Sequence, residues 1–147
     1  MIRLVFALRR LPNLSRAEFQ VYWLNQHAPL VAGFATDLNI LRYVQTHTLD
    51  DPSNAAAQKA RGNMETEYDG VAELWWASET ELAEQSSNAA REAGAALLED
   101  EKKFIDLENS PIWFAYEYPQ INPNPEDIIA SPKSNIVRVF FPLRHQH

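Results

Sequence analysis

Hydrophobic and polar residues alternate along four short stretches of the chain, and this alternation predicts four β-strands. The stretches are residues 1–10, 38–47, 68–77 and 111–118. In the first stretch, one face carries Ile2, Leu4, Phe6 and Leu8, and the other carries Arg3, Val5, Ala7 and Arg9. Both faces of this stretch are largely apolar, so we expect it to be a central strand.

A helical period replaces the alternation after the first predicted strand. Ser15 and Glu18 have the spacing of a capping box, in which each side chain accepts a free backbone N–H at a helix start. Phe19, Trp23 and His27 then recur four residues apart, which places them on one face of the predicted helix. A titratable ring therefore lies in line with two large aromatic side chains.

Pro29 predicts a break in this helix, because proline has no N–H and disfavours helical geometry in the residue before it. We expect a kink or a restart at Ala28, which leaves His27 in the last turn before the break. His27 is the strongest candidate for chemistry. The alternative is a core histidine with both ring nitrogens satisfied, which is the commoner role of a single histidine on an apolar face.

Between the second and third predicted strands, residues 50–67 have few large apolar side chains, and we expect a surface excursion with a helical turn over 54–61. After the third strand, a second capping box at Ser78 and Glu81 begins a helical region that runs to about Leu98, with an interruption near 86–88. A short turn at 99–107 follows. The order βαββαβ is that of a ferredoxin-like α+β fold, an antiparallel sheet with two helices on one face.

Three segments are expected from the composition along the chain. The ferredoxin-like domain spans 1–118, a proline-rich linker spans 119–135, and a C-terminal edge strand spans 136–147. The last segment repeats the pattern of the N-terminal strand. It is therefore expected to pair along a sheet edge in its own subunit or in a partner, and Pro142 restricts it to an edge position.

Composition narrows the classes of function. The 147-residue chain has a formal charge of −7 with scattered basic residues, which argues against nucleic acid or an anionic membrane surface as its partner. It has no cysteine, so thiol nucleophiles, thiolate metal sites and disulfides are excluded. It contains no membrane-spanning apolar run, glycine-rich phosphate loop, Gly-x-Ser-x-Gly elbow or HExxH motif. We expect a cytoplasmic protein without a cofactor or metal.

Two helices cover only one face of a four-stranded sheet. The other face would expose a large apolar area, and the economical solution is a second copy packed sheet against sheet as a homodimer. The alternative is a monomer in which the 50–67 segment and the C-terminal tail cover that face.

Three blocks of sequence, at residues 8–31, 68–78 and 97–106, resemble the EthD family of the dimeric α+β barrel superfamily. The resemblance covers about residues 2–118. It implies a dimer whose two sheets form a barrel, with a pocket for a small hydrophobic or aromatic ligand between the sheet and helices of each subunit. Relatives include cofactor-free isomerases, dehydratases and cyclases of ring compounds, together with accessory proteins of catabolic operons. Haem binding occurs in distant relatives of the superfamily.

The resemblance also implies roles for two residues of this chain. His27, before Ala28 and Pro29, matches a histidine to which catalytic roles are assigned in some relatives, and Tyr43 matches a tyrosine on the second strand. A cysteine that one type of lactone isomerase uses has no counterpart. We therefore expect His27 to act as acid and base, and Tyr43 to donate a hydrogen bond to a substrate carbonyl.

The remaining candidates are assigned by residue type. Glu73 is the carboxylate expected to orient His27, and Phe19, Trp23 and Trp75 are the expected flat walls of a ring-binding pocket. Each has a structural alternative: an ion pair with Arg3 or Arg42 for Glu73, and a place in the core or the dimer interface for the aromatic residues. Asp100 and Glu101 are expected to cap a short helix, and His145 and His147 to lie in a solvated chain end.

Overall fold

A four-stranded antiparallel sheet forms the centre of the fold, with the strands in the order β2-β3-β1-β4. The strands are β1 (Ile2–Leu8), β2 (Arg42–His47), β3 (Gly70–Trp76) and β4 (Ile112–Tyr116). The computed structural model describes residues 1–62, 65–84, 86–118, 120–121 and 139–141, and every element named here lies within residues 1–117. All four predicted strands and the ferredoxin-like α+β arrangement are confirmed.

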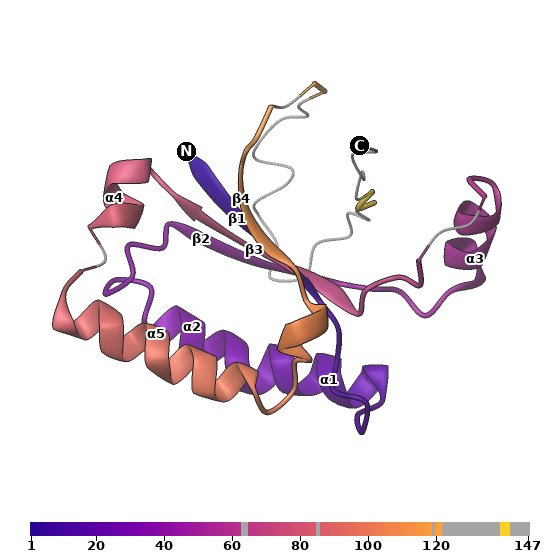
Figure 1. Ribbon diagram of the computed structural model, residues 1–147, viewed down its shortest axis with the longest axis horizontal. Helices are drawn as coiled ribbons and strands as arrows, with labels where there is room; N and C mark the ends of the chain where they lie inside the picture. The colour runs from indigo at the N-terminus through magenta and orange to yellow at the C-terminus, as the bar shows by residue number, and fades with distance from the viewer. Residues whose placement is uncertain (63–64, 85, 119, 122–138, 142–147) are drawn as a thin grey trace. The chain divides into compact units, whose positions relative to one another are not determined.

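The main helices lie on one face of this sheet (Figure 1). After β1 come α1 (Arg16–Tyr22), a π-helical turn (Trp23–His27) and α2 (Ala28–Gly33); after β3 come α4 (Glu79–Ala83) and α5 (Asn88–Glu101). The predicted helical turn in the 50–67 segment is α3 (Pro52–Lys59), which lies beyond the end of the sheet (Figure 1). A 3-10 turn (Leu107–Asn109) leads into β4.

The predicted capping box starts α1. The Ser15 hydroxyl accepts from the Glu18 backbone N–H at 3.2 Å, and the Glu18 carboxylate accepts from the Ser15 backbone N–H at 2.8 Å. The expected break at Ala28 is present as the π-helical turn, in which the Ala28 N–H donates to the Trp23 carbonyl one residue further back than in an α-helix. The chain then restarts as α2, with Pro29 in its first turn, where a missing N–H costs nothing.

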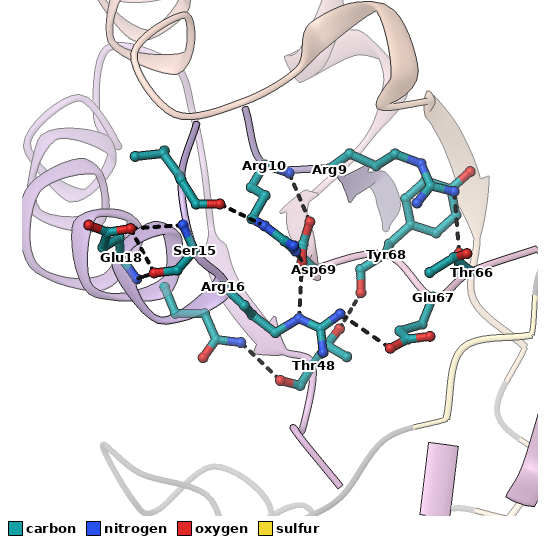
Figure 2. Close-up of polar contacts among 12 residues, drawn as sticks. Arg9, Arg10, Ser15, Arg16, Glu18, Thr48, Thr66, Glu67, Tyr68 and Asp69 are labelled. Carbon is teal, nitrogen blue, oxygen red and sulfur yellow. Dashed lines mark hydrogen bonds and ion pairs between the residues drawn. The ribbon is translucent and has the colours of Figure 1, made fainter. Parts of the chain in front are cut away.

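A buried carboxylate fixes the start of α1 against the sheet (Figure 2). Asp69, just before β3, accepts hydrogen bonds from the backbone N–H of Arg10 at 2.9 Å, from the Arg10 guanidinium, and from Arg16 Nε at 3.0 Å. Arg16 also binds Glu67 at 3.2 Å. Since Arg16 is the first residue of α1, this cluster fixes the helix that leads to His27.

The main core lies between the sheet and the helices. It contains the buried side chains of Phe6, Leu8, Phe19, Trp23, Ala72, Phe104 and Ile105. Gly70 allows the Trp23 indole to lie directly on β3, because a Cβ atom at this position would be 2.5 Å from Trp23 Cζ3. The lack of a side chain at Gly70 is therefore needed for the packing of the core.

Exposed apolar side chains concentrate on the edge strand β4. Ile112, Trp113, Phe114 and Tyr116 are each between 42% and 55% exposed. By contrast, the face of the sheet opposite the helices carries buried side chains of β1 and β3, including Val5, Val71 and Trp75. Trp75 on this face is buried and is therefore not part of the exposed apolar surface of the sheet. Most of the predicted linker and C-terminal strand lies outside the described residues.

Candidate functional site

His27 ends the π-helical turn and is buried beneath α5. Its Nδ1 atom lies 2.8 Å from Oδ2 of Asp100, and its ring packs against Phe104 with the centroids 5.1 Å apart. The helix period of α1 and the π-helical turn bring His27 to this position, and α5 supplies Asp100 from 73 residues further along the chain.

Asp100 accepts hydrogen bonds from three side chains. Besides His27, the Tyr22 hydroxyl donates to its Oδ1 atom at 2.7 Å and the Lys103 ammonium at 3.0 Å. Burial opposes ionisation of Asp100, but the hydrogen bonds from Tyr22, His27 and Lys103 outweigh it and lower its pKa. Asp100 is therefore a carboxylate, and the proton of the shared hydrogen bond resides on His27 Nδ1.

The His27 imidazole is neutral near pH 7. Burial lowers its pKa below the usual value, and the favourable effect of Asp100 only partly offsets this. With the proton on Nδ1, the Nε2 atom carries a lone pair. Nε2 has no hydrogen-bond partner among the described residues. The atom is not fully buried, so it keeps some contact with solvent. Its chemical capacity is to accept a proton.

Tyr43 on β2 lies next to Trp23. The Trp23 indole N–H donates to the Tyr43 hydroxyl at 3.0 Å, and the Gln45 side-chain amide donates to the same oxygen at 2.8 Å. Burial raises the pKa of Tyr43 to about 12, although these two hydrogen bonds lower it. The phenol is therefore protonated at neutral pH and is available as a hydrogen-bond donor.

Glu101 is a second titratable group on the inner side of α5. It lies one turn after Leu97 at the end of α5 and is partly buried, and its carboxyl has no hydrogen-bond partner in the described part of the chain. Burial and the neighbouring Asp100 charge raise its pKa to about 7. The negative charge of Glu101 also opposes ionisation of Tyr43, which contributes to the raised Tyr43 pKa.

The structure divides the predicted site residues between two faces of the sheet. On the helix side, Phe19 contacts Trp23 with ring centroids 5.6 Å apart, and Trp23 binds Tyr43. Glu73 and Trp75 lie on the opposite face, since alternate residues of β3 point to opposite sides. The predicted walls Phe19 and Trp23 are therefore together, and Trp75 is apart from them.

The prediction that Glu73 orients His27 is wrong. Glu73 is completely buried and accepts a hydrogen bond from Arg3 at 2.8 Å, which is the structural ion pair considered as the alternative. Trp75 lies under the Arg42 guanidinium, which is 4.5 Å from the ring centroid. The residue that binds His27 is Asp100, for which the sequence suggested only a helix cap.

The prediction that Asp100 and Glu101 cap a short helix is also wrong. Asp100 and Glu101 are the last residues of the 14-residue helix α5 and point toward the core. The signal that would have found them is the period of α5, in which Ala90, Ala93 and Leu97 mark the inner stripe and the two acids continue it.

A hollow of about 270 Å³ opens between α4 and the loop that joins α2 to β2. Its walls are Ala35, Thr36, Asn39, Ile40, Leu41 and Glu81, and it includes none of the predicted site residues. His27, by contrast, is only 5% exposed. A ligand that reaches Nε2 must therefore open space among the side chains around the ring.

No group of three or more His, Asp or Glu side chains among the described residues is placed to hold a metal ion. No helix within those ranges has both the length and the apolar character needed to cross a bilayer.

Comparisons with known proteins agree with this fold. The profile of the EthD domain family matches residues 11–108. An ethyl tert-butyl ether D (EthD) family protein from Bacillus halodurans C-125 superposes with a TM-score of 0.52 at 17% identity, over 80% of this chain and 100% of that one. An EthD-like protein from Ralstonia eutropha JMP134 gives 0.51 at 13% identity, over 83% and 95%.

HapK from Hahella chejuensis gives a TM-score of 0.51 at 9% identity, over 84% of this chain and 99% of that one. At these identities the structural likeness establishes the fold alone. No curated protein matches the chain.

Proposed function

Because the chain belongs to the EthD family, we propose that it is a cofactor-independent enzyme of the isomerase, dehydratase or cyclase type that acts on a small cyclic or aromatic carbonyl compound. The observation that carries this proposal is the buried His27–Asp100 pair, whose hydrogen bond leaves Nε2 of a neutral imidazole without a protein partner among the described residues. A neutral imidazole held by a carboxylate is a suitable general base at physiological pH.

The proposed first step is removal of a proton from the carbon beside the carbonyl. The C–H bond breaks, a new N–H bond forms at His27 Nε2, and the electron pair moves onto the carbonyl oxygen to give an enolate. Asp100 stabilises the resulting imidazolium through Nδ1–H, and the Tyr43 hydroxyl donates to the enolate oxygen. The imidazolium then returns the proton to another carbon for isomerisation, or gives it to a leaving hydroxyl for loss of water.

The proposed assembly is a homodimer. Its support is the row of exposed apolar side chains on β4, where Ile112, Trp113, Phe114 and Tyr116 are each roughly half exposed. Burying such a row against a second copy removes apolar surface from water at β4, the edge strand of the described sheet. Two-fold symmetry would use the same edge of both subunits.

The test uses NMR to measure the exchange of carbon-bound hydrogen for deuterium in a panel of cyclic ketones and lactones in D2O. This assay detects the first step whatever the later steps are. The His27→Ala variant should lose roughly a hundredfold or more of the exchange rate, which is the usual contribution of a general base. Gln26→Ala, an exposed position in the same turn, is the matched control and should retain the rate. Exchange at the wild-type rate in His27→Ala would contradict the proposal.

A second candidate function is a non-catalytic small-molecule-binding or accessory protein of a catabolic pathway. The observation that favours it is the enclosure of His27, together with a hollow that lies elsewhere in the fold. Binding of a carbonyl compound beside His27, with no hydrogen exchange for any member of the panel, would support this second function.

A further inference from the structure

A chain of hydrogen bonds on the helix side of β2 ends at the Tyr43 hydroxyl. Tyr43, Gln45 and His47 alternate along β2 and therefore point to the same face. His47 Nε2 lies 2.8 Å from Gln45 Oε1, and Gln45 Nε2 lies 2.8 Å from the Tyr43 oxygen. Gln45 Nε2 also lies 2.9 Å from the backbone carbonyl oxygen of Trp23.

The direction of each hydrogen bond is fixed by chemistry. The Trp23 carbonyl can only accept, so the atom of Gln45 that faces it must be the amide nitrogen. The Gln45 oxygen then faces His47 and must accept, so His47 carries its proton on Nε2. Burial lowers the pKa of His47, which agrees with a neutral ring stacked on the Trp23 indole at a centroid distance of 4.6 Å.

This arrangement leaves the Tyr43 hydroxyl with one role. Its oxygen accepts from the Trp23 indole N–H and from the Gln45 amide, and a phenol oxygen has no more than two acceptor positions. The hydroxyl proton must therefore point away from both donors. No acceptor for this proton is present among the described residues, although a half-buried hydroxyl that lacks an acceptor costs free energy.

We propose that Gln45 is a positioning residue that makes Tyr43 an obligate hydrogen-bond donor, so that the site takes ligands that present an unprotonated oxygen, such as a carbonyl, an enolate or a phenolate. This inference rests on the proposed function in that it concerns the ligand of the same site. It adds a selection rule, because a ligand that presents only N–H or O–H donors finds both acceptor positions of Tyr43 occupied.

The Gln45→Glu variant reverses the direction of the hydrogen bond between residue 45 and Tyr43. The introduced carboxylate cannot donate, so the hydrogen bond to the Trp23 carbonyl is lost, the Tyr43 proton turns toward the carboxylate, and one acceptor position of the Tyr43 oxygen is freed. His47 Nε2–H still has an acceptor. In the Gln45→Met variant, the new side chain fills a similar volume without donating, so the Tyr43 proton stays free for a ligand and the acceptor position that Gln45 occupied is opened.

The experiment measures the binding of two probes of equal shape by ¹⁹F NMR. Pentafluorophenol is ionised near neutral pH and presents only an acceptor oxygen, whereas pentafluoroaniline presents N–H donors. The wild-type chain should bind the phenolate at least about tenfold more tightly than the aniline. Gln45→Glu should weaken phenolate binding at least about tenfold and strengthen aniline binding, while Gln45→Met should change phenolate binding by less than about threefold and also strengthen aniline binding.

Two control variants define the position and the cause. Tyr43→Phe should abolish the preference for the phenolate. Gln20→Glu introduces the same charge on α1 and removes a comparable amide donor, since Gln20 binds the Thr48 carbonyl at 2.9 Å, and it should leave both affinities unchanged. If Gln45→Glu does not fold, the wild-type preference and its loss in Tyr43→Phe still test the inference.

The inference is overturned if the wild-type chain binds the aniline as tightly as the phenolate, or binds neither probe. It is also overturned if Gln45→Met weakens phenolate binding as much as Gln45→Glu does, since that would indicate a packing role, or if Gln45→Met leaves aniline binding unchanged. A preference that depends on Gln45 and Tyr43, found together with unchanged hydrogen exchange in His27→Ala, would leave this inference standing and remove the proposed enzyme function.

Discussion

Glu101→Gln should make the protein more stable, by an amount that grows as the pH rises from about 4.5 to about 7. The Glu101 carboxyl lies on the inner side of α5 without a hydrogen-bond partner among the described residues, and its pKa is raised from 4.5 to about 7. A raised carboxyl pKa means that the folded state favours the protonated form. The cost to folding is therefore absent below the unfolded pKa, grows between the two values, and is complete above about 7.

The size of the effect follows from the shift. The difference from 4.5 to about 7 corresponds to about 3 kcal/mol at about 1.4 kcal/mol per unit, and partial contact of the carboxyl with solvent reduces this to about 2 kcal/mol. Glutamine has nearly the same volume and no charge, so the variant removes the cost and keeps the packing. The gain should be near zero at about pH 4 and about 2 kcal/mol at about pH 8.

The assay is urea-induced unfolding, monitored by tryptophan fluorescence at one protein concentration and at several pH values. The difference between variant and wild type cancels the titration of every other group to first order. Glu92→Gln, an exposed position on the same helix, is the control and should show no such dependence. A difference that stays flat between about pH 5 and about pH 8 would refute the reasoning.

Three further predictions concern the partner of His27, the packing of Trp23 and the dimer. Asp100→Asn removes the charged acceptor of three hydrogen bonds, so it should cost about 2 kcal/mol in urea unfolding and lower the pKa of His27 further, measured by proton NMR of the imidazole. Gly70→Ala places a methyl group 2.5 Å from Trp23 Cζ3 and should cost about 1–3 kcal/mol in the same assay, whereas Gly94→Ala, with open space around it on α5, should not destabilise. Phe114→Asp on β4 should shift the chain from dimer to monomer in analytical ultracentrifugation, and a wild-type chain that is already monomeric would contradict the dimer.

Local patterns were sufficient to predict the elements of the fold. The alternation in residues 1–10 predicted β1 and its two faces, because a side chain on a strand points to the side opposite its neighbour. Ser15 and Glu18 predicted the start of α1 through a contact that spans only three residues. Pro29 predicted the break after His27, since a missing N–H acts within one helical turn.

The partner of His27 could not be found in the same way. Glu73 is an acid within an apolar strand, which suggests a partner for His27. Its place in the alternation of β3 puts it on the far face of the sheet, with Arg3. Asp100 is 73 residues from His27, and the packing of α5 against the π-helical turn decides their contact. Sequence periodicity assigns a residue to a face, whereas the pairing of two faces depends on tertiary structure.

The site therefore combines a predicted residue with an unpredicted one. His27, Tyr43, Phe19 and Trp23 lie where the sequence pattern placed them, on the helix side of the sheet. Asp100, Glu101 and Gln45 were missed as site residues, because each is an ordinary polar residue until its neighbours in space are known.

The most direct test of the account is the protonation state of His27, measured by ¹⁵N NMR of the imidazole nitrogens near neutral pH. The account predicts a neutral ring with the proton on Nδ1, donated to Asp100, and a bare Nε2 that can take a proton from a substrate. Asp100→Asn should change the Nδ1 signal and identify it. A doubly protonated ring, or a neutral ring with its proton on Nε2, would contradict the central claim.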